Sequence, residues 1–129
     1  MNMNPKVKSK WVEALKSGEY LQGKGALRTM ENGEVRHCCL GVLCDLYSKQ
    51  FGEPWQQDGG TSYFLGSRDY LPTKVRHWAG LILTYGGHVR MAEFTASGAE
   101  AKPQLSSLPT WNDNGEPFER IAEAIVGQL

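Results

Sequence analysis

The sequence has no excess of either charge and no long apolar run. Among its 129 residues, 14 Lys and Arg balance 14 Asp and Glu, so the formal net charge at pH 7 is zero. A general nucleic-acid binder needs a basic excess to neutralise phosphates, so this balance argues against one. No apolar stretch approaches the length of a membrane span, and the start MNMNPKVKSK lacks the apolar core of a signal peptide. We therefore expect no membrane association and a cytoplasmic location.

Cysteine is also scarce. Cys38, Cys39 and Cys44 lie close together, and an odd number with an adjacent pair is a poor disulfide framework. The paired knuckles of a zinc site are missing, although His37 beside Cys38 leaves a metal ligand set or an activated thiolate open as alternatives. Because a cysteine in an apolar helix behaves as a small hydrophobe, we expect all three in the core, with no metal, no cofactor and no catalytic residue.

The composition is that of an ordinary globular chain, with 40% hydrophobic and 22% charged residues. Its length predicts one domain, residues 1–129. Apolar residues at helical spacing predict four helices, over residues 5–17, 39–50, 71–80 and 115–127. Gly41 lies inside the second helix, where glycine is unfavourable, so we expect close backbone packing at that position.

Short strands are expected between the helices. Asn32-Gly33 tolerates the positive φ angles of a tight turn, so the flanking segments 26–30 and 35–39 predict an antiparallel hairpin. A second hairpin is expected from residues 81–86 and 88–95. The expected architecture is α+β, a small single domain with about four helices and one or two short β-hairpins.

Two segments predict irregular structure. Residues 52–70 contain four glycines and predict a long loop, with one short strand at 62–65. Residues 96–107 predict a flexible polar connection.

Five segments carry a resemblance in their order along the chain: WVEALKSGEY, QGKGALR, HCCLGVLCDLY, LPTKVRHWAGL and WNDNGEPFERIAEAI. With them the chain resembles a family of small uncharacterised proteins encoded by tailed bacteriophages. It is more distantly similar to an actinobacterial domain of unknown function. The resemblance implies a phage origin, an accessory role outside the virion and a location in the cytoplasm of the infected bacterial host. It implies no catalytic residue.

Basic residues gather around a glycine-rich turn. Gly23-Lys24-Gly25 lacks the spacing of a phosphate-binding P-loop and precedes a predicted strand instead of a helix. Glycine still lets backbone N–H groups approach an anion, and Lys24, Arg28 and Arg36 add positive charge. Arg28 and Arg36 lie on opposite arms of the predicted hairpin, so we expect them to be neighbours. A tight turn with solvated basic side chains is the alternative.

A second candidate segment precedes the last predicted helix. Asn112, Asp113 and Asn114 offer hydrogen-bonding groups suited to a base edge or to ribose hydroxyls, and Trp111 offers a ring for stacking. The same residue types also form turns and helix caps, which is the alternative. The candidate ligand-binding residues are therefore Lys24, Arg28, Arg36, Trp111, Asn112, Asp113 and Asn114.

Two functions from different classes fit the sequence. The first is a non-enzymatic small-molecule-binding protein that sequesters a nucleotide-derived second messenger of host anti-phage defence, within a homo-oligomer whose interfaces complete the pocket. Its ligand is a small phosphorylated nucleotide, stacked on aromatic side chains such as Trp55 and Tyr70. The second is a protein-binding modulator that docks on and inhibits a host protein. An enzyme ranks third, because no triad or metal-ligand spacing supports one.

Overall fold

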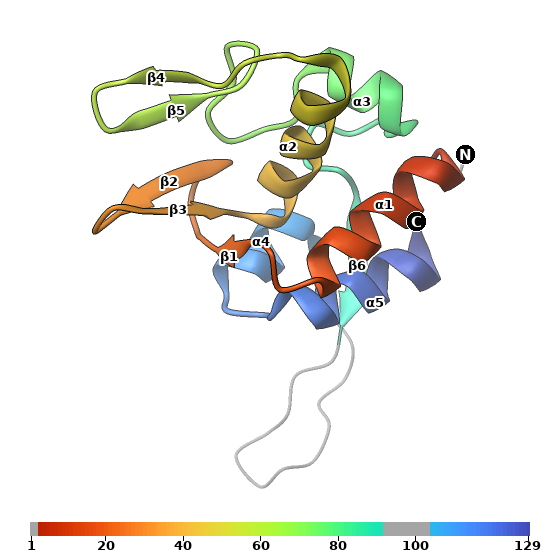
Figure 1. Cartoon of the computed structure of the whole chain (residues 1–129). Helices are drawn as coiled ribbons and strands as arrows, with labels where there is room; N and C mark the ends of the chain where they lie inside the picture. The colour runs from red at the N-terminus through yellow and green to blue at the C-terminus, as the bar shows by residue number, and fades with distance from the viewer. Residues whose placement is uncertain (1–2, 92–103) are drawn as a thin grey trace, which may run out of the picture.

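Helix α2 (Cys39–Phe51) runs through the middle of the molecule, and the other elements pack around it (Figure 1). The structure is a computed structural model that describes residues 3–91 and 104–129. The first six residues of α2 are all buried, as the wide apolar surface of this segment predicts. Gly41 lies so close to the preceding chain that an added β-carbon would overlap the carbonyl oxygen of Leu27. The expected close packing at Gly41 is therefore confirmed.

Helix α1 (Pro5–Lys16) lies along helix α5 (Phe118–Gln128), so segments from opposite ends of the chain form one layer (Figure 1). Asn4 caps α1, because its Oδ1 accepts hydrogen bonds from the backbone N–H groups of Lys6 and Val7 at 2.9 and 3.3 Å. The buried face of α1 carries Trp11, whose Nε1 donates to the carbonyl oxygen of Cys39 in α2 at 2.9 Å. This helix was predicted with nearly the observed bounds.

The other two helices are short. Helix α3 (Thr73–Ala79) lies within the predicted segment 71–80. Helix α4 (Leu108–Asp113) was not expected, because its Asn-Asp sequence is typical of turns. The predicted start of the last helix at residue 115 was too early: Pro117, with an extended ψ of 155°, precedes the first helical residue. The described residues thus form five helices.

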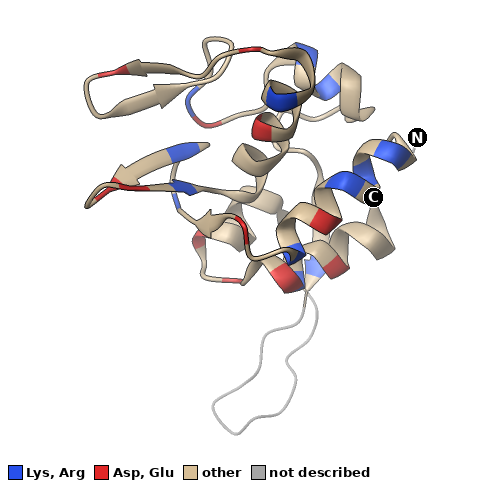
Figure 2. Cartoon of the chain, in the orientation of Figure 1, with Lys and Arg blue, Asp and Glu red and all other residues tan. Residues whose placement is uncertain are grey.

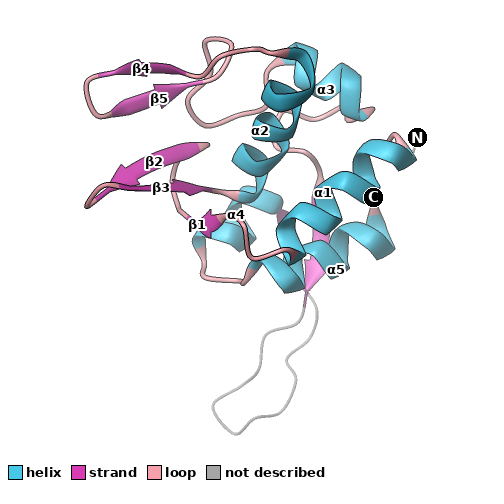
Figure 3. Cartoon of the chain, in the orientation of Figure 1, coloured by secondary structure: helices cyan, strands magenta, loops and turns pink. Residues whose placement is uncertain are grey.

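The first hairpin is confirmed by strands β2 (Arg28–Glu31) and β3 (Glu34–His37), which pair antiparallel around Asn32 and Gly33. Both turn residues have positive φ angles, 50° and 78°. A two-residue strand β1 (Leu21–Gln22) pairs in parallel with the other edge of β3 (Figure 3). The sheet order is therefore β1-β3-β2.

The segment predicted as a long loop contains a hairpin of its own. Strands β4 (Gln56–Asp58) and β5 (Thr61–Tyr63) pair antiparallel beside the first hairpin (Figure 3). The single strand expected at 62–65 was therefore incomplete. The glycine-rich composition predicted a loop, but Gly59 belongs to the turn of this hairpin, where its φ is 61°.

The second predicted hairpin was wrong in its pairing. Strand β6 (His88–Met91) pairs with β7 (Gln104–Ser107) and not with residues 81–86. Backbone groups of 81–86 bond elsewhere: the carbonyl oxygen of Thr84 accepts from the backbone N–H of Leu71 at 2.7 Å. The expectation of a flexible polar connection at 96–107 was wrong for residues 104–107, which form β7. The predicted strand residues 92–95 and the remainder of that connection, 96–103, lie outside the described residues.

Charged side chains of each sign are concentrated in some parts of the fold (Figure 2), although ion pairs such as that of Arg120 with Glu116 join the two signs. Figure 2 shows Lys and Arg on the first turns of α1 and around α3, and Asp and Glu on α5 and at the tips of both hairpins. No helix within the described ranges combines the length and the apolar character that a bilayer crossing requires.

Candidate functional site

The two segments that the sequence nominates meet in the structure. The turn at Gly23–Gly25 lies against α4, although about ninety residues separate them in the chain. Asn112 makes the central contact: its Oδ1 accepts from Gln22 Nε2 at 3.0 Å and from the backbone N–H of Cys39 at 3.2 Å. Its Nδ2 donates to the carbonyl oxygen of Gly23 at 2.7 Å. The fully buried Asn112 side chain thus ties β1, α2 and α4 together.

Trp111 is also an interior residue. Its side chain is 2% exposed, and its Nε1 donates to the carbonyl oxygen of Val89 at 3.0 Å. The ring has no free face for a base, and the amide of Asn112 has no unused group for a ligand. The assignment of Trp111 and Asn112 to a binding site is therefore corrected: helix α4 turns both inward, where the sequence predicted an exposed turn.

Asp113 occupies the glycine turn that we expected to receive an anion. Its Oδ1 accepts a hydrogen bond from the backbone N–H of Gly25 at 3.0 Å. The carboxylate thus already uses the Gly25 N–H group that a bound phosphate would need as a hydrogen-bond donor. Lys24 and Asn114 are exposed on either side of this contact, and Asn114 ends helix α4.

Arg28 and Arg36 lie on paired strands but on opposite faces of the hairpin. Arg28 pairs in register with His37, and Arg36 pairs with Thr29, so the two arginines differ by one position and point apart. The guanidinium of Arg28 lies 4.6 Å from the centroid of the Trp55 ring. The expectation that Arg28 and Arg36 form one basic site is therefore wrong.

Each arginine has partners within the protein. Arg28 donates to Ser62 Oγ at 3.1 Å and to Gln57 Oε1 at 3.2 Å, which ties the two hairpins together. Arg36 forms ion pairs with Glu31 and Glu34 at 3.8 and 3.5 Å on the other face. Both side chains support the strands that carry them.

A polar cluster around Asp45 of α2 went unnoticed in the sequence. Its carboxylate accepts from Tyr20 Oη at 2.6 Å and from Trp55 Nε1 at 3.0 Å, and it lies 3.4 Å from Lys49 Nζ. These hydrogen bonds and the charge of Lys49 outweigh burial and lower the pKa of Asp45. Burial and the neighbouring carboxylate raise the pKa of Tyr20 to about 12. Both groups are therefore held in one protonation state at neutral pH and suit a structural clamp better than proton transfer.

His37 lies in the same cluster, between the edges of Tyr20 and Trp55, with ring centroids 5.2 and 5.7 Å away. Its side chain is 7% exposed, and its buried Nε2 has no hydrogen-bond partner. Burial, which the attraction of Asp45 only partly offsets, and the nearby charges of Arg28 and Lys49 lower its pKa to about 4. His37 is therefore neutral at pH 7. No sequence pattern marks the cluster, because its members come from four separate segments.

The three cysteines lie in the core, as expected. Burial raises the pKa of Cys38 to about 11 and raises those of Cys39 and Cys44 as well. Because the thiolate is the reactive form, none of these thiols is activated at neutral pH. Within the part of the chain that the structure describes, no group of three His, Cys, Asp or Glu side chains is arranged to hold a metal ion.

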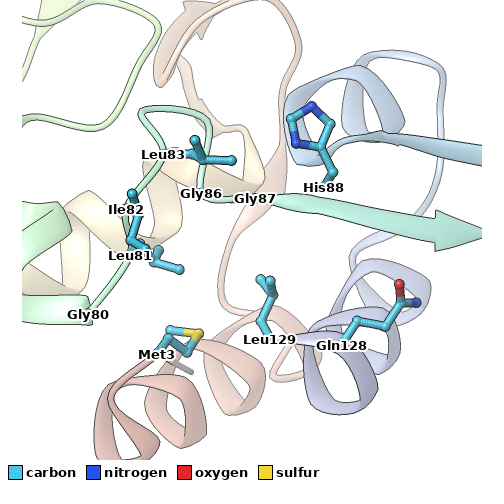
Figure 4. A pocket seen from close by; sticks show the side chains of 10 residues that line it. All are labelled: Met3, Gly80, Leu81, Ile82, Leu83, Gly86, Gly87, His88, Gln128 and Leu129. Carbon is cyan, nitrogen blue, oxygen red and sulfur yellow. The ribbon is translucent and has the colours of Figure 1, made fainter. Parts of the chain in front are cut away.

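The loop at residues 81–87 exposes large apolar side chains. Ile82, Leu83 and Tyr85 are 67%, 46% and 50% exposed, whereas Leu81 is buried. Figure 4 shows Ile82 and Leu83 beside a recess between this loop and the end of α5. The recess has a volume of about 250 Å³, and Met3 and Leu129 form part of its wall. We call residues 81–87 the apolar loop.

The backbone of the apolar loop is held in place. Arg76 donates to the carbonyl oxygen of Ile82 at 2.6 Å, and the backbone N–H of Leu81 donates to the carbonyl oxygen of Arg76 at 2.9 Å. The loop ends in two buried glycines, Gly86 and Gly87, with φ angles of 81° and 140°. A β-carbon on Gly87 would lie 3.0 Å from a methyl group of Leu129. The apolar side chains are thus displayed on a fixed backbone.

A separate recess lies beside the start of α3. It has a volume of about 320 Å³ and is lined by Tyr70 and Lys74, together with the hydroxyl-bearing Ser67 and Thr73. It combines an aromatic ring, a cation and the exposed hydroxyl group of Thr73, whereas the buried Ser67 hydroxyl bonds to the backbone of Tyr70. The sequence named Tyr70 as a stacking residue, but it did not pair it with Lys74.

The architecture defines a small α+β domain in which a central helix, buried over its first half, packs against a helical layer and two hairpins. The chain belongs to the family described as Domain of unknown function (DUF8296), whose model matches residues 3–129. No curated protein and no solved structure matches the chain. The resemblance to phage proteins stays a prediction.

Proposed function

We propose that this chain is a non-enzymatic binding protein that docks on another protein through the apolar loop. The observation that carries the proposal is the exposure of Ile82, Leu83 and Tyr85 on a backbone held by hydrogen bonds. Contiguous exposed apolar side chains mark interaction sites, and a fixed backbone lowers the entropy lost on binding. The resemblance to phage proteins makes a host protein the expected partner.

The size of the recess in Figure 4 supports a protein partner over a metabolite. Its volume of about 250 Å³ is below the roughly 300–1,000 Å³ typical of small-molecule sites. Its wall consists mainly of glycine backbone and apolar side chains, with His88 and Gln128 at one side. Such a recess fits one apolar side chain of a docked polypeptide.

Photo-crosslinking in phage-infected bacteria tests this proposal. A photoreactive phenylalanine analogue replaces Ile82, and the matched control carries it at Val35, which is exposed on the distant β2–β3 hairpin. We expect one host polypeptide to crosslink from position 82 and not from 35, and Leu83→Asp to abolish the product. No product, or the same product from both positions, would contradict docking through this loop. A crosslink to a second copy of the chain would identify self-association instead.

A phosphorylated nucleotide is the second candidate ligand, and the recess at Tyr70 and Lys74 favours it. Its volume of about 320 Å³ reaches the range of small-molecule sites, and it joins a stacking ring to a cation. In this second function the protein sequesters a nucleotide-derived second messenger of host anti-phage defence.

Thermal unfolding with cyclic and NAD-derived nucleotides tests the second candidate. Saturating ligand raises the Tm by several degrees if it binds the folded state alone. Tyr70→Ala and Lys74→Ala remove this shift, whereas Lys6→Ala on α1 leaves it in place. If no nucleotide moves the Tm, and native mass spectrometry of protein from infected bacteria finds no retained small molecule, this function is rejected.

A further inference from the structure

Tyr85 of the apolar loop also lines a third recess, which is acidic. This recess has a volume of about 170 Å³, and its wall includes Tyr85, Asp69, Asp113 and Gly25. Tyr85 therefore belongs to the apolar loop and also lines the recess that contains the two carboxylates. The acidic recess therefore adjoins the proposed docking surface, because Tyr85 is part of both.

Among the described residues, no lysine or arginine forms an ion pair with the two carboxylates of this recess. Asp69 forms no hydrogen bond or ion pair with any residue that the structure describes, and no lysine or arginine lines the recess. Asp113 accepts only from the backbone N–H of Gly25 and from Asn112 Nδ2. Lys24, the basic residue beside Gly25, extends toward Gly115, with its Nζ about 4.0 Å from where a β-carbon of Gly115 would lie.

We propose that the acidic recess receives the guanidinium group of an arginine in the docked protein. This inference rests on the proposed docking function and specifies its partner: a polypeptide with an apolar residue near an arginine. A guanidinium can stack on an aromatic ring and donate to carboxylates, and this recess is lined by both kinds of group, Tyr85 with Asp69 and Asp113. The volume of about 170 Å³ fits a side chain and is too small for a typical metabolite site.

Binding of defined peptides to the full chain tests the inference. The probes are acetylated octapeptides that carry one phenylalanine and one arginine, separated by one to four alanines. Matched peptides carry citrulline in place of arginine, which keeps the shape and removes the charge. Affinity is measured by fluorescence polarisation. We expect the best arginine peptide to bind about tenfold more tightly than its citrulline partner.

Variants separate this inference from the docking function. Asp69→Asn removes most of the preference for arginine, whereas Asp58→Asn, at the tip of the β4–β5 hairpin, leaves it unchanged. Leu83→Asp weakens both peptides. Equal affinity for arginine and citrulline peptides, or a preference that survives Asp69→Asn, overturns the arginine site and leaves docking intact. Peptide affinity that Leu83→Asp does not change, or the absence of any binding, overturns docking and the arginine site together.

Discussion

Individual side chains in this protein often serve the fold where the sequence favoured a ligand. Asn112 is the clearest case, because every polar atom of its amide group bonds to the protein. The carboxylate of Asp113 likewise accepts a hydrogen bond from the backbone N–H of Gly25, in the turn where we expected an anion to bind. A buried amide of this kind specifies one arrangement of the chain, since any other leaves polar groups unpaired.

Asn112→Ala is expected to lower the free energy of unfolding by about 2–4 kcal/mol, because it strands the buried carbonyl of Gly23 and the backbone N–H of Cys39. Urea denaturation measures the change. Asn114→Ala is the control, since Asn114 is exposed at the end of the same helix. Equal loss in both variants would contradict the role given to Asn112.

His37 makes stability depend on pH. Its pKa is about 4 in the folded protein and 6.5 in its unperturbed state, so between these values the unfolded chain binds a proton that the folded chain does not. Stability is therefore complete above about pH 6.5 and falls as the pH drops toward 4, by up to about 3 kcal/mol. The lowered pKa of Asp45 adds a further loss below pH 3.8.

His37→Phe is expected to flatten the pH dependence between pH 4 and 6.5, because a neutral ring then fills the space between Tyr20 and Trp55. Denaturation curves at several pH values measure it, and His77→Gln on the exposed side of α3 is the control. An unchanged slope in His37→Phe would assign the acid sensitivity to other groups.

At the scale of elements, helix α2 depends on its close approach to the chain before β2. Gly41→Ala is expected to destabilise the protein by about 3 kcal/mol or more, because its β-carbon would overlap the carbonyl oxygen of Leu27. Gly127→Ala in α5 meets no neighbouring atom and is expected to stabilise by up to about 1 kcal/mol. Thermal unfolding of both variants compares them, and similar Tm changes would refute the tight contact at Gly41.

Helices and strands could be predicted where residues close together in the sequence determine the local structure. The cap at Asn4 and the buried spacing of Val7 and Trp11 define α1, and Asn32-Gly33 defines the first hairpin. Helix α4 was missed because its turn-forming residues become helical through contacts made far along the chain, such as Asn112 with Gln22. The Asp45 cluster was missed for the same reason, since tertiary packing alone brings Tyr20 and Trp55 to one carboxylate.

At the scale of the whole molecule, stability is uneven. The first half of α2 is buried in the common core. The three-residue strands β4 and β5 are exposed or half-buried apart from Ser62, and the side chain of Arg28 joins them to β2. We expect backbone amides of α2 to exchange with solvent through global unfolding, and those of β4 and β5 through local opening at least about a hundredfold faster. Hydrogen exchange followed by NMR measures both, and equal protection would contradict a separable β4–β5 hairpin.

The packing of α1 against α5 also bears on synthesis. Ribosomes release a chain from its N-terminus, so α1 emerges while its partner is not yet made. The apolar side chains of Val7, Trp11 and Leu15 therefore stay exposed to solvent until α5 leaves the exit tunnel. Nascent chains stalled before α5 should therefore expose this face and be bound by chaperones.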